Sequence, residues 1–208
     1  MRIQKTMIIL TGNIGSGKST LCKKAMKNEY VIISRDSLRY GIGAGDYVFN
    51  KYYEPVLAKT VLFMCEEFLK KKVPVIIDEV NISKRSRKPY LKLAKKYGYD
   101  AVSLLFPRRS QEICVERRMQ NPHGADRQTW ELVWDMFNTA YKKPSLREGF
   151  KLIIPLKTKG DGYEICDEKV QTLQPEFQDN IKESSSGILH NWMLAIRTQF
   201  TRNKEIKN

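Results

Sequence analysis

The sequence lacks several features that would define its class. None of its apolar runs approaches the roughly 20 residues that a membrane-spanning helix needs, there is no CxxC pair, and there are only two histidines. We therefore expect no membrane association and no histidine metal site. The N-terminus leads into a glycine-rich loop without the apolar segment and cleavage site of a signal peptide. The four scattered cysteines favour reduced thiols in a cytoplasmic protein over disulfides or a zinc site.

Negative charge is also scarce. Asp and Glu number 23 against 37 Lys and Arg, which gives a formal net charge of +14. Such an excess attracts polyanions such as nucleic acid, although a basic surface can also serve solubility alone. With 208 residues, 41% of them hydrophobic, the chain can bury a core without disulfides or a metal.

Short apolar segments alternate with segments of helical periodicity over the first three quarters of the chain. We expect strands at 6–11, 30–34, 73–78, 101–106 and 150–156. We expect helices at 18–28, 54–72, 86–99, 110–120 and 127–141. This alternation is typical of a parallel sheet covered by helices on both faces. The predicted fold is therefore α/β, with a parallel sheet of about five strands flanked by helices.

The character of the chain changes after Leu156. The following residues are polar and weakly periodic, and they lead into residues 188–208, where apolar side chains recur every four positions. We therefore predict one domain over 1–156 and a mostly helical C-terminal extension of unknown role over 157–208. Its terminal amphipathic helix is expected to pack on the core or on a second subunit of a homo-oligomer rather than on a membrane.

Residues 11–20, TGNIGSGKST, follow the first expected strand and match the pattern G-x-x-x-x-G-K-[ST]. Glycines at this spacing keep side chains away, so that backbone N–H groups can close around a phosphate. Lys18 can reach the β- and γ-phosphates, and the Ser19 hydroxyl can bind Mg²⁺. The pattern predicts a P-loop for ATP and Mg²⁺, although the donor base stays open. The expected nucleotide contacts are Gly12, Asn13, Gly15, Ser16, Gly17, Lys18, Ser19 and Thr20.

A P-loop occurs in GTPases, motor ATPases and small kinases. The sequence has no N/T-K-x-D guanine signature, and a core that ends near residue 156 leaves little room for a motor. The Asp-Glu pair in VIIDEVN keeps an ATPase interpretation open. A small phosphotransferase is the favoured class.

SRDSLR, residues 34–39, begins where the second expected strand ends. The carboxyl ends of parallel strands face the ligand crevice, so we expect Asp36 to lie across from the P-loop. A carboxylate there can orient an acceptor hydroxyl and accept its proton. Arg39, one helical turn on, can bind an anionic part of the acceptor. The alternative is that Ser34 or Asp36 caps a short helix while Arg39 is solvated.

The segment after the third expected strand offers a carboxylate and a basic run. Asp78 stands where a carboxylate commonly holds Mg²⁺. Residues 84–96 then contain seven basic residues and no acid. Because bases at a helix N-terminus oppose its dipole, either an external anion compensates them or the run is a solvated face. Arg85 and Arg87 are therefore candidate substrate-binding residues.

Arginines flank the loop punctuation NPHG, at residues 121–124. A mobile lid could carry such an arginine to the transferring phosphate, where it would neutralise developing charge. Solvated arginines at a helix end are the alternative. Spacing alone does not choose among Arg117, Arg118 and Arg127.

Together, GNIGSGKST, SRDSLR, VIIDEVNISKRSRKPYLKLAKKYGY and the ERRMQN helix end resemble the P-loop kinase domain of phage-type polynucleotide 5'-kinases, in the zeta-toxin-like kinase group. The resemblance covers about residues 5–156. It implies that Asp36 activates the 5'-hydroxyl, that Arg39 grips the acceptor phosphate, and that Lys18 and Ser19 bind ATP phosphates and Mg²⁺. It also implies a lid arginine on the donor phosphates, for which Arg118 is the best match and Arg117 and Arg127 are rivals.

The sequence departs from this family in two places, and it also lacks the phosphatase signature that is fused to some relatives. The lid lacks the second arginine of an R-x-x-x-R pair. Glu79 replaces the aspartate of an Asp-x-Asn element whose asparagine is Asn81, a candidate substrate contact, and Asp78 competes for the metal. KGDGYE lacks the first aspartate of the DxDG[TS] phosphatase signature, so we expect no 3'-phosphatase activity.

The favoured function is that of an ATP- and Mg²⁺-dependent kinase acting on 5'-hydroxyl ends of RNA or DNA. One alternative is a small-molecule kinase of the same group, with a sugar, nucleoside or nucleotide-sugar acceptor. The other is a nucleic-acid-binding ATPase that transfers no phosphoryl group. RNA or DNA preference and the biological pathway stay open.

Overall fold

The computed structural model describes residues 5–25, 30–159 and 162–172. Its centre is a seven-stranded sheet with the order β2-β3-β1-β4-β5-β6, in which β7 also pairs with β5. Strands β1 to β5 pair in parallel, which confirms the predicted α/β fold. The strands are β1 Thr6–Thr11, β2 Val31–Ile33, β3 Val75–Ile77, β4 Asp100–Leu105, β5 Leu152–Lys159, β6 Gly162–Ile165 and β7 Gln171–Thr172.

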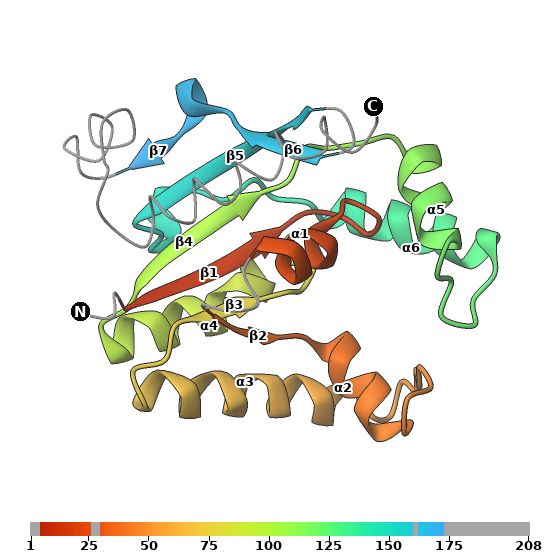
Figure 1. Ribbon diagram of the computed structural model, residues 1–208, viewed down its shortest axis with the longest axis horizontal. Coiled ribbons are helices and arrows are strands. Elements are labelled where there is room, and N and C mark those ends of the chain that lie inside the picture. The colour runs from red at the N-terminus through yellow and green to blue at the C-terminus, as the bar shows by residue number, and fades with distance from the viewer. Residues whose placement is uncertain (1–4, 26–29, 160–161, 173–208) are drawn as a thin grey trace, which may run out of the picture.

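Helices cover the sheet and extend beyond one of its ends (Figure 1). The α-helices are α1 Lys18–Ala25, α2 Arg35–Ile42, α3 Glu54–Lys70, α4 Lys84–Tyr97, α5 Gln111–Met119 and α6 Arg127–Ala140, with short 3₁₀ helices at Leu146–Glu148 and Asp167–Lys169. Helices α3 and α4 lie along one face, whereas α5 and α6 stand beyond the carboxyl ends of β1 and β4. This end of the sheet is where parallel α/β folds bind ligands.

The central strand β1 is buried on both faces because its side chains alternate. Met7 and Ile9 pack into the core cluster that contains residues of α3 and α4. Ile8 and Leu10 pack into the opposite cluster, with Leu21 of α1. An all-apolar strand of this kind is what a parallel sheet between two layers requires.

Beyond Leu156 the chain adds further strands to the sheet. Strand β5 continues to Lys159, and β6 and β7 both pair with it in antiparallel fashion. The end of β5 is polar in sequence because residues 157–159, which pair with β6, are exposed. The described residues 157–159 and 162–172 form strands and one 3₁₀ turn. The expected helix over 188–208 lies outside the described residues.

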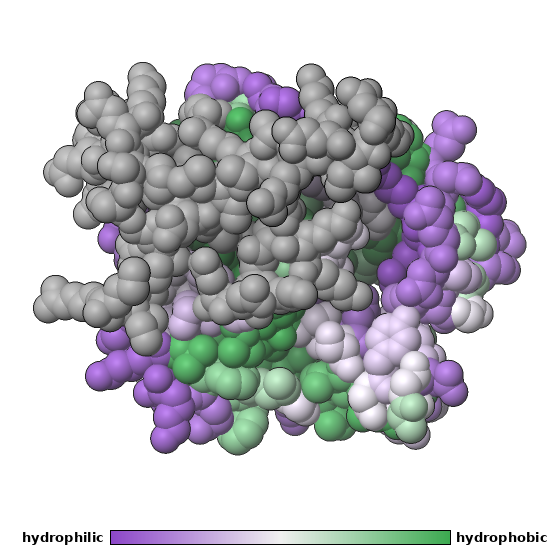
Figure 2. Space-filling view, in the orientation of Figure 1, coloured by the Kyte–Doolittle hydropathy of each residue, from purple (hydrophilic) through white to green (hydrophobic). Residues whose placement is uncertain are grey.

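The molecular surface is uneven in polarity. Figure 2 shows a mainly hydrophilic surface over α5 and α6, and hydrophobic surface over part of α3. The large exposed apolar residues of α3 are Val56 and Phe63. Within the described part of the chain, no helix combines the length and the apolar character that crossing a membrane would require.

Candidate phosphate-transfer site

The glycine-rich loop joins the end of β1 to the start of α1. Gly15 and Gly17 have positive φ angles of 63° and 85°, where side chains other than hydrogen are disfavoured. A Cβ atom on Gly15 would overlap the carbonyl oxygen of Cys114, and one on Gly17 would lie 2.8 Å from the Tyr163 hydroxyl. The loop is therefore closely enclosed by α5 and β6, and only glycine fits at these two positions.

Lys18 folds back over the loop that precedes it. Its Nζ donates hydrogen bonds to the carbonyls of Gly12 and Asn13 at 2.9 and 2.7 Å, and to the Ser16 hydroxyl at 3.2 Å. The residue is only 8% exposed. Burial lowers the pKa of Lys18 to about 8, against the opposing charges of Asp78 and Asp36. Burial thus destabilises the charged form of the Lys18 amine, and a bound anion would stabilise it.

Ser19 and Asp78 approach the loop from two elements. Ser19 is exposed in the first turn of α1. Asp78 follows β3, is 9% exposed, and its backbone N–H donates to the Ile33 carbonyl at 2.9 Å. A hydroxyl and one carboxylate beside a phosphate site are the donor set that Mg²⁺ commonly uses. The residues present therefore fit the predicted metal.

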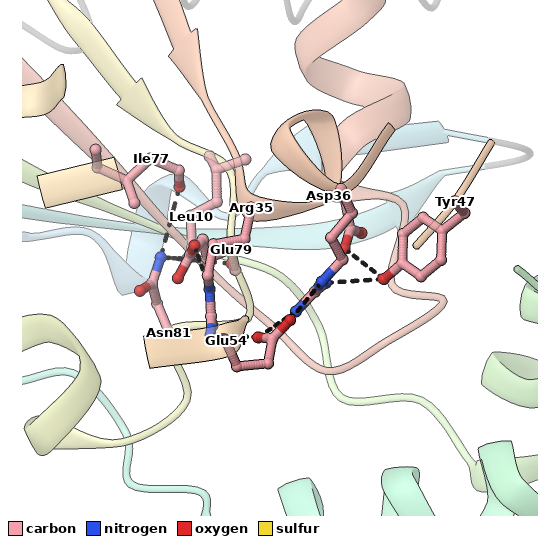
Figure 3. Close-up of polar contacts among 9 residues, drawn as sticks. Leu10, Arg35, Asp36, Tyr47, Glu54, Ile77, Glu79 and Asn81 are labelled. Carbon is pink, nitrogen blue, oxygen red and sulfur yellow. Dashed lines mark hydrogen bonds and ion pairs between the residues drawn. The ribbon is translucent and has the colours of Figure 1, made fainter. Parts of the chain in front are cut away.

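Asp36 lies in the first turn of α2, and its carboxylate points towards Tyr47 (Figure 3). Its Oδ1 accepts a hydrogen bond from the Tyr47 hydroxyl at 2.9 Å and an ion pair from Arg39, and its Oδ2 lies 3.9 Å from Nη2 of Arg118. Burial alone would raise the pKa of Asp36, but the Tyr47 hydrogen bond and the two arginines outweigh it and lower the pKa. Ser34 stands at the N-cap without a side-chain capping bond, so the capping alternative does not describe it.

Arg39 is beside Asp36 as expected, but its guanidinium is already engaged. Nε and Nη2 bind the two carboxylate oxygens of Glu54 at 2.8 and 2.6 Å. Nη1 binds Asp36 and donates to the Tyr47 hydroxyl at 2.8 Å. Figure 3 shows this chain of contacts, which continues through Glu54 to Arg35. An acceptor phosphate would have to displace Glu54, so in this conformation Arg39 acts as a partner of Asp36.

The predicted lid consists of α5, α6 and their connecting loop. The guanidinium of Arg118 lies 4.2 Å from the centre of the Trp130 ring, which directs it towards Asp36. Arg117 donates to the Tyr163 hydroxyl at 3.5 Å. Arg127 instead pairs with Glu116 at 2.8 Å, with its side chain 48% exposed. The structure thus brings Arg118 to Asp36 and leaves Arg127 on an outer surface of the lid.

The loop between α5 and α6 contacts residues in and just after α2. His123 has a φ of 54°. The centre of its ring lies 4.0 Å from the ring centre of Tyr47 and 5.6 Å from that of Tyr40. The Asn121 amide donates to the Tyr40 hydroxyl at 3.4 Å. The lid is therefore closed over α2 in this structure. The lid also contacts the phosphate loop, because the side-chain amide of Asn13 donates to the Trp134 carbonyl of α6 at 3.1 Å.

The prediction that Arg87 binds substrate is wrong. Its side chain is fully buried, and Nε and Nη2 bind Glu148 at 2.9 and 2.8 Å. Nη1 binds the carbonyls of Asn81 and Lys142 at 2.9 and 3.0 Å. A signal was present, because Arg87 shares one helical stripe with the apolar residues Tyr90, Leu91 and Ala94.

The other two candidate substrate contacts lie in different surroundings. Asn81 is 2% exposed with a φ of 47°, and its amide donates to the Leu10 carbonyl at 3.0 Å. It joins the ends of β1 and β3, because the same amide also donates to the Ile77 carbonyl at 3.5 Å (Figure 3). Arg85 is exposed in the first turn of α4.

Two residues that sequence reasoning missed complete the loop's surroundings. The Tyr163 hydroxyl donates to the Ser16 carbonyl. The guanidinium of Arg109 lies 5.6 Å from the Tyr163 ring centre, and its Nε and Nη2 are buried without a hydrogen-bond partner among the described residues. Arg109 could have been found, because it follows the carboxyl end of an apolar strand, where ligand contacts gather. Tyr163 carried no comparable local signal.

Comparison with protein families agrees with this geometry. Residues 7–144 match the family model described as AAA domain (AAA_33). The chain belongs to this family. Its fold and loop are those of a P-loop kinase domain. A search of curated proteins found no match.

Several solved structures share the fold of this P-loop kinase domain. A chain of the Pnkp1/Rnl/Hen1 RNA repair complex is 25% identical, with a TM-score of 0.53; the match covers 66% of this protein and 45% of that chain. Kti12 from Chaetomium thermophilum, in complex with ADP-AlF3, is 19% identical with a TM-score of 0.53, covering 74% and 90%. A candidate kinase from Chloroflexus aurantiacus is 16% identical with a TM-score of 0.53, covering 68% and 82%. The last two likenesses concern the fold alone.

Proposed function

We propose that this P-loop kinase transfers the γ-phosphate of ATP to the 5'-hydroxyl end of RNA or DNA. The observation that carries the proposal is the ionised Asp36 carboxylate, which Tyr47 and Arg39 hold in place opposite Arg118. A P-loop alone serves many ATPases. A fixed carboxylate across from it is what transfer to a hydroxyl requires.

On the donor side, the backbone N–H groups of the loop and the N-terminus of α1 bind the phosphates. Lys18 exchanges its bonds to the Gly12 and Asn13 carbonyls for bonds to phosphate oxygens. Arg118 adds a second positive charge where the γ-phosphoryl group leaves. Ser19 and Asp78 would hold Mg²⁺, which when bound neutralises phosphate charge.

On the acceptor side, Asp36 orients the 5'-hydroxyl and takes its proton. The hydroxyl oxygen forms a bond to the γ-phosphorus, while the bond between that phosphorus and the β–γ bridging oxygen breaks and ADP leaves. The proton ends on the Asp36 carboxylate. Arg39 and Tyr47 keep the carboxylate from rotating, which preserves the in-line geometry.

A nucleic-acid acceptor is supported by two further observations. The net charge of +14 favours a polyanion over a neutral sugar. The relative in the RNA repair complex shares this fold at 25% identity. Because the match covers less than half of that relative's chain, its partners and further activities are not carried over.

The test uses γ-labelled ATP, Mg²⁺ and 5'-hydroxyl oligonucleotides of RNA and DNA, with Lys18→Ala as background. We expect label at the 5' end, and we expect Asp36→Asn to lower kcat by about 10²- to 10⁴-fold while ATP binding is retained. Asp135→Asn, an exposed aspartate on α6, is the matched control and should keep full activity.

Three results would contradict the proposal. Absence of label on every oligonucleotide would exclude polynucleotide transfer. Label on free sugars or nucleosides but not on oligonucleotides would favour the small-molecule kinase. ATP hydrolysis stimulated by nucleic acid, without label at any 5' end, would favour the nucleic-acid-binding ATPase.

A further inference from the structure

A groove of about 670 Å³ lies between α4 and the beginnings of β4 and β5. Its floor is largely apolar, and its rim along α4 is basic. The floor includes Leu91, Ala94, Tyr99, Ala101 and Phe150, and the rim carries Lys84, Lys88, Lys92 and Lys95. We name this feature the lysine groove. None of these residues belongs to the phosphate-transfer site.

The four rim lysines form one stripe. Their spacing of four, four and three residues places them on one face of α4, over about 16 Å at 1.5 Å per residue. All four are exposed. Within the described part of the chain, no ion pair is found for any of them, whereas Lys96, on another face, pairs with Glu66 at 2.7 Å.

The acids of the groove do not neutralise this stripe. Glu148 pairs with Arg87 at 2.8 Å, and Asp100 pairs with Lys151 at 2.9 Å. The first turn of α4 contains no acid either, so the helix dipole and its basic residues repel each other. The groove therefore presents four uncompensated positive charges, an arrangement that an external anion would stabilise.

The shape of the charge distribution selects the kind of anion. A single phosphate group can contact one or two of the lysines, but not charges spread over about 16 Å. A nucleic-acid strand supplies a phosphate about every 3.4 Å and can follow the whole stripe. The stripe begins at Lys84, where α4 follows the carboxyl end of β3, and it ends at Lys95, shortly before the start of β4.

We propose that the lysine groove binds the phosphate backbone of a nucleic-acid strand outside the phosphate-transfer site. This goes beyond the proposed function, because such binding needs no phosphoryl transfer. The contacts read charge and not sequence. The groove therefore contributes affinity for long strands and none for short acceptors that fill only the transfer site.

Salt dependence measures the proposed contacts directly. Each neutralised phosphate on a single strand contributes about −0.7 to the slope of log K against log salt. Four lysines thus account for a slope of about −2.8. Between 50 and 200 mM NaCl this amounts to about a 50-fold change in Kd.

The experiment measures the anisotropy of a 3'-labelled 20-nucleotide RNA with the full chain over this salt range. One variant replaces the rim lysines with glutamine: K84Q, K88Q, K92Q and K95Q. The matched control removes the same charge from exposed lysines in and next to α3: K51Q, K59Q, K70Q and K71Q. A third variant keeps the charge of the rim: K84R, K88R, K92R and K95R.

We expect the rim glutamine variant to flatten the slope by about 2 to 3, the control by less than 1, and the arginine variant to keep the wild-type slope. Equal flattening in the rim and control variants would overturn the proposal, because the lysines would then act only through net charge. Loss of the slope in the arginine variant would also overturn it. So would equal displacement of the RNA by polyglutamate of the same length, which would indicate an acidic protein partner.

A second readout separates this proposal from the proposed function. If dinucleotide acceptors keep their KM in the rim glutamine variant while the 20-nucleotide acceptor loses affinity, both proposals are supported. If the slope falls as expected but no oligonucleotide is phosphorylated, the groove stands and the proposed function fails. If oligonucleotides are phosphorylated but the salt slope of the rim glutamine variant is unchanged, the proposed function stands and the proposed role of the lysine groove fails.

Discussion

Replacing Lys18 with methionine tests whether burial in the phosphate loop destabilises the charged form of the Lys18 amine. In the folded chain, burial lowers the pKa of Lys18 from an ordinary 10.5 to about 8. Below pH 8 the amine is charged in both states of the chain. Between pH 8 and 10.5 the unfolded chain binds a proton that the folded chain has lost, so stability rises with pH in this window.

The magnitude follows from the size of this window. Each unit of difference between the folded and unfolded pKa values corresponds to about 1.4 kcal/mol. Because the folded amine is still half protonated at pH 8, raising the pH from 8 to 9.5 should increase the free energy of unfolding of the wild type, relative to Lys18→Met, by about 1.5 kcal/mol. Hydrogen bonds lost on substitution shift the two curves by a constant and do not change this pH dependence.

The assay is urea denaturation followed by circular dichroism at pH 7, 8, 9 and 9.5. Lys59→Met, an exposed position on α3, controls for the loss of an ordinary lysine and should run parallel to the wild type. Saturating ATP analogue should remove the pH dependence, because phosphate charges restore the amine's preference for its proton. A wild-type curve that stays parallel to Lys18→Met within about 0.5 kcal/mol would refute the reasoning.

Three further predictions concern the lid, the core and the acceptor carboxylate. Arg118→Ala should lower kcat by about 10²- to 10³-fold, whereas Arg127→Ala should change it only a few-fold; equal losses in steady-state assays would contradict the assignment. Arg87→Ala should lower the free energy of unfolding in urea by about 3 to 5 kcal/mol because it leaves a buried carboxylate unpaired, and a loss below about 1 kcal/mol would show that the pair is solvated. Tyr47→Phe removes a hydrogen bond that lowers the pKa of Asp36, so the acid limb of the kcat–pH profile should move to higher pH; an unmoved limb would exclude that role.

The phosphate loop could be predicted because its chemistry is local. Glycines, lysine and serine within nine residues define the motif. The apolar strand before it places the loop at the carboxyl end of the sheet. The electrostatic effect of Asp36 on Lys18, which raises the pKa of that lysine, agrees with the expected placement, although 18 residues separate the two. That placement follows from the rule that parallel strands end at one edge of a sheet.

The partners of the arginines could not be predicted in the same way. Arg39 binds Glu54, 15 residues away, and Arg87 binds Glu148, 61 residues away. Such pairs depend on how helices and loops pack, which local patterns do not specify. A buried arginine in a basic run also looks like its exposed neighbours until the apolar stripe beside it is considered.

The antiparallel strands were missed because they are short and partly exposed. Strand β6 has four residues and β7 has two. Their pairing depends on a turn and on the edge of β5 rather than on a long periodic segment. Sequence periodicity is weakest for elements of this length.

The position of Tyr163 has a consequence for the smallest chain that could function. The family match ends at residue 144. Yet this tyrosine, 19 residues later, donates a hydrogen bond to the Ser16 carbonyl, and its ring meets that of Phe106 edge to face with the ring centres 5.1 Å apart. A chain shortened to Leu156 would keep every residue of the nucleotide motif but lose one wall around its glycines. The nucleotide motif is thus necessary for the phosphate cradle without being sufficient, because the cradle also includes Tyr163 of β6.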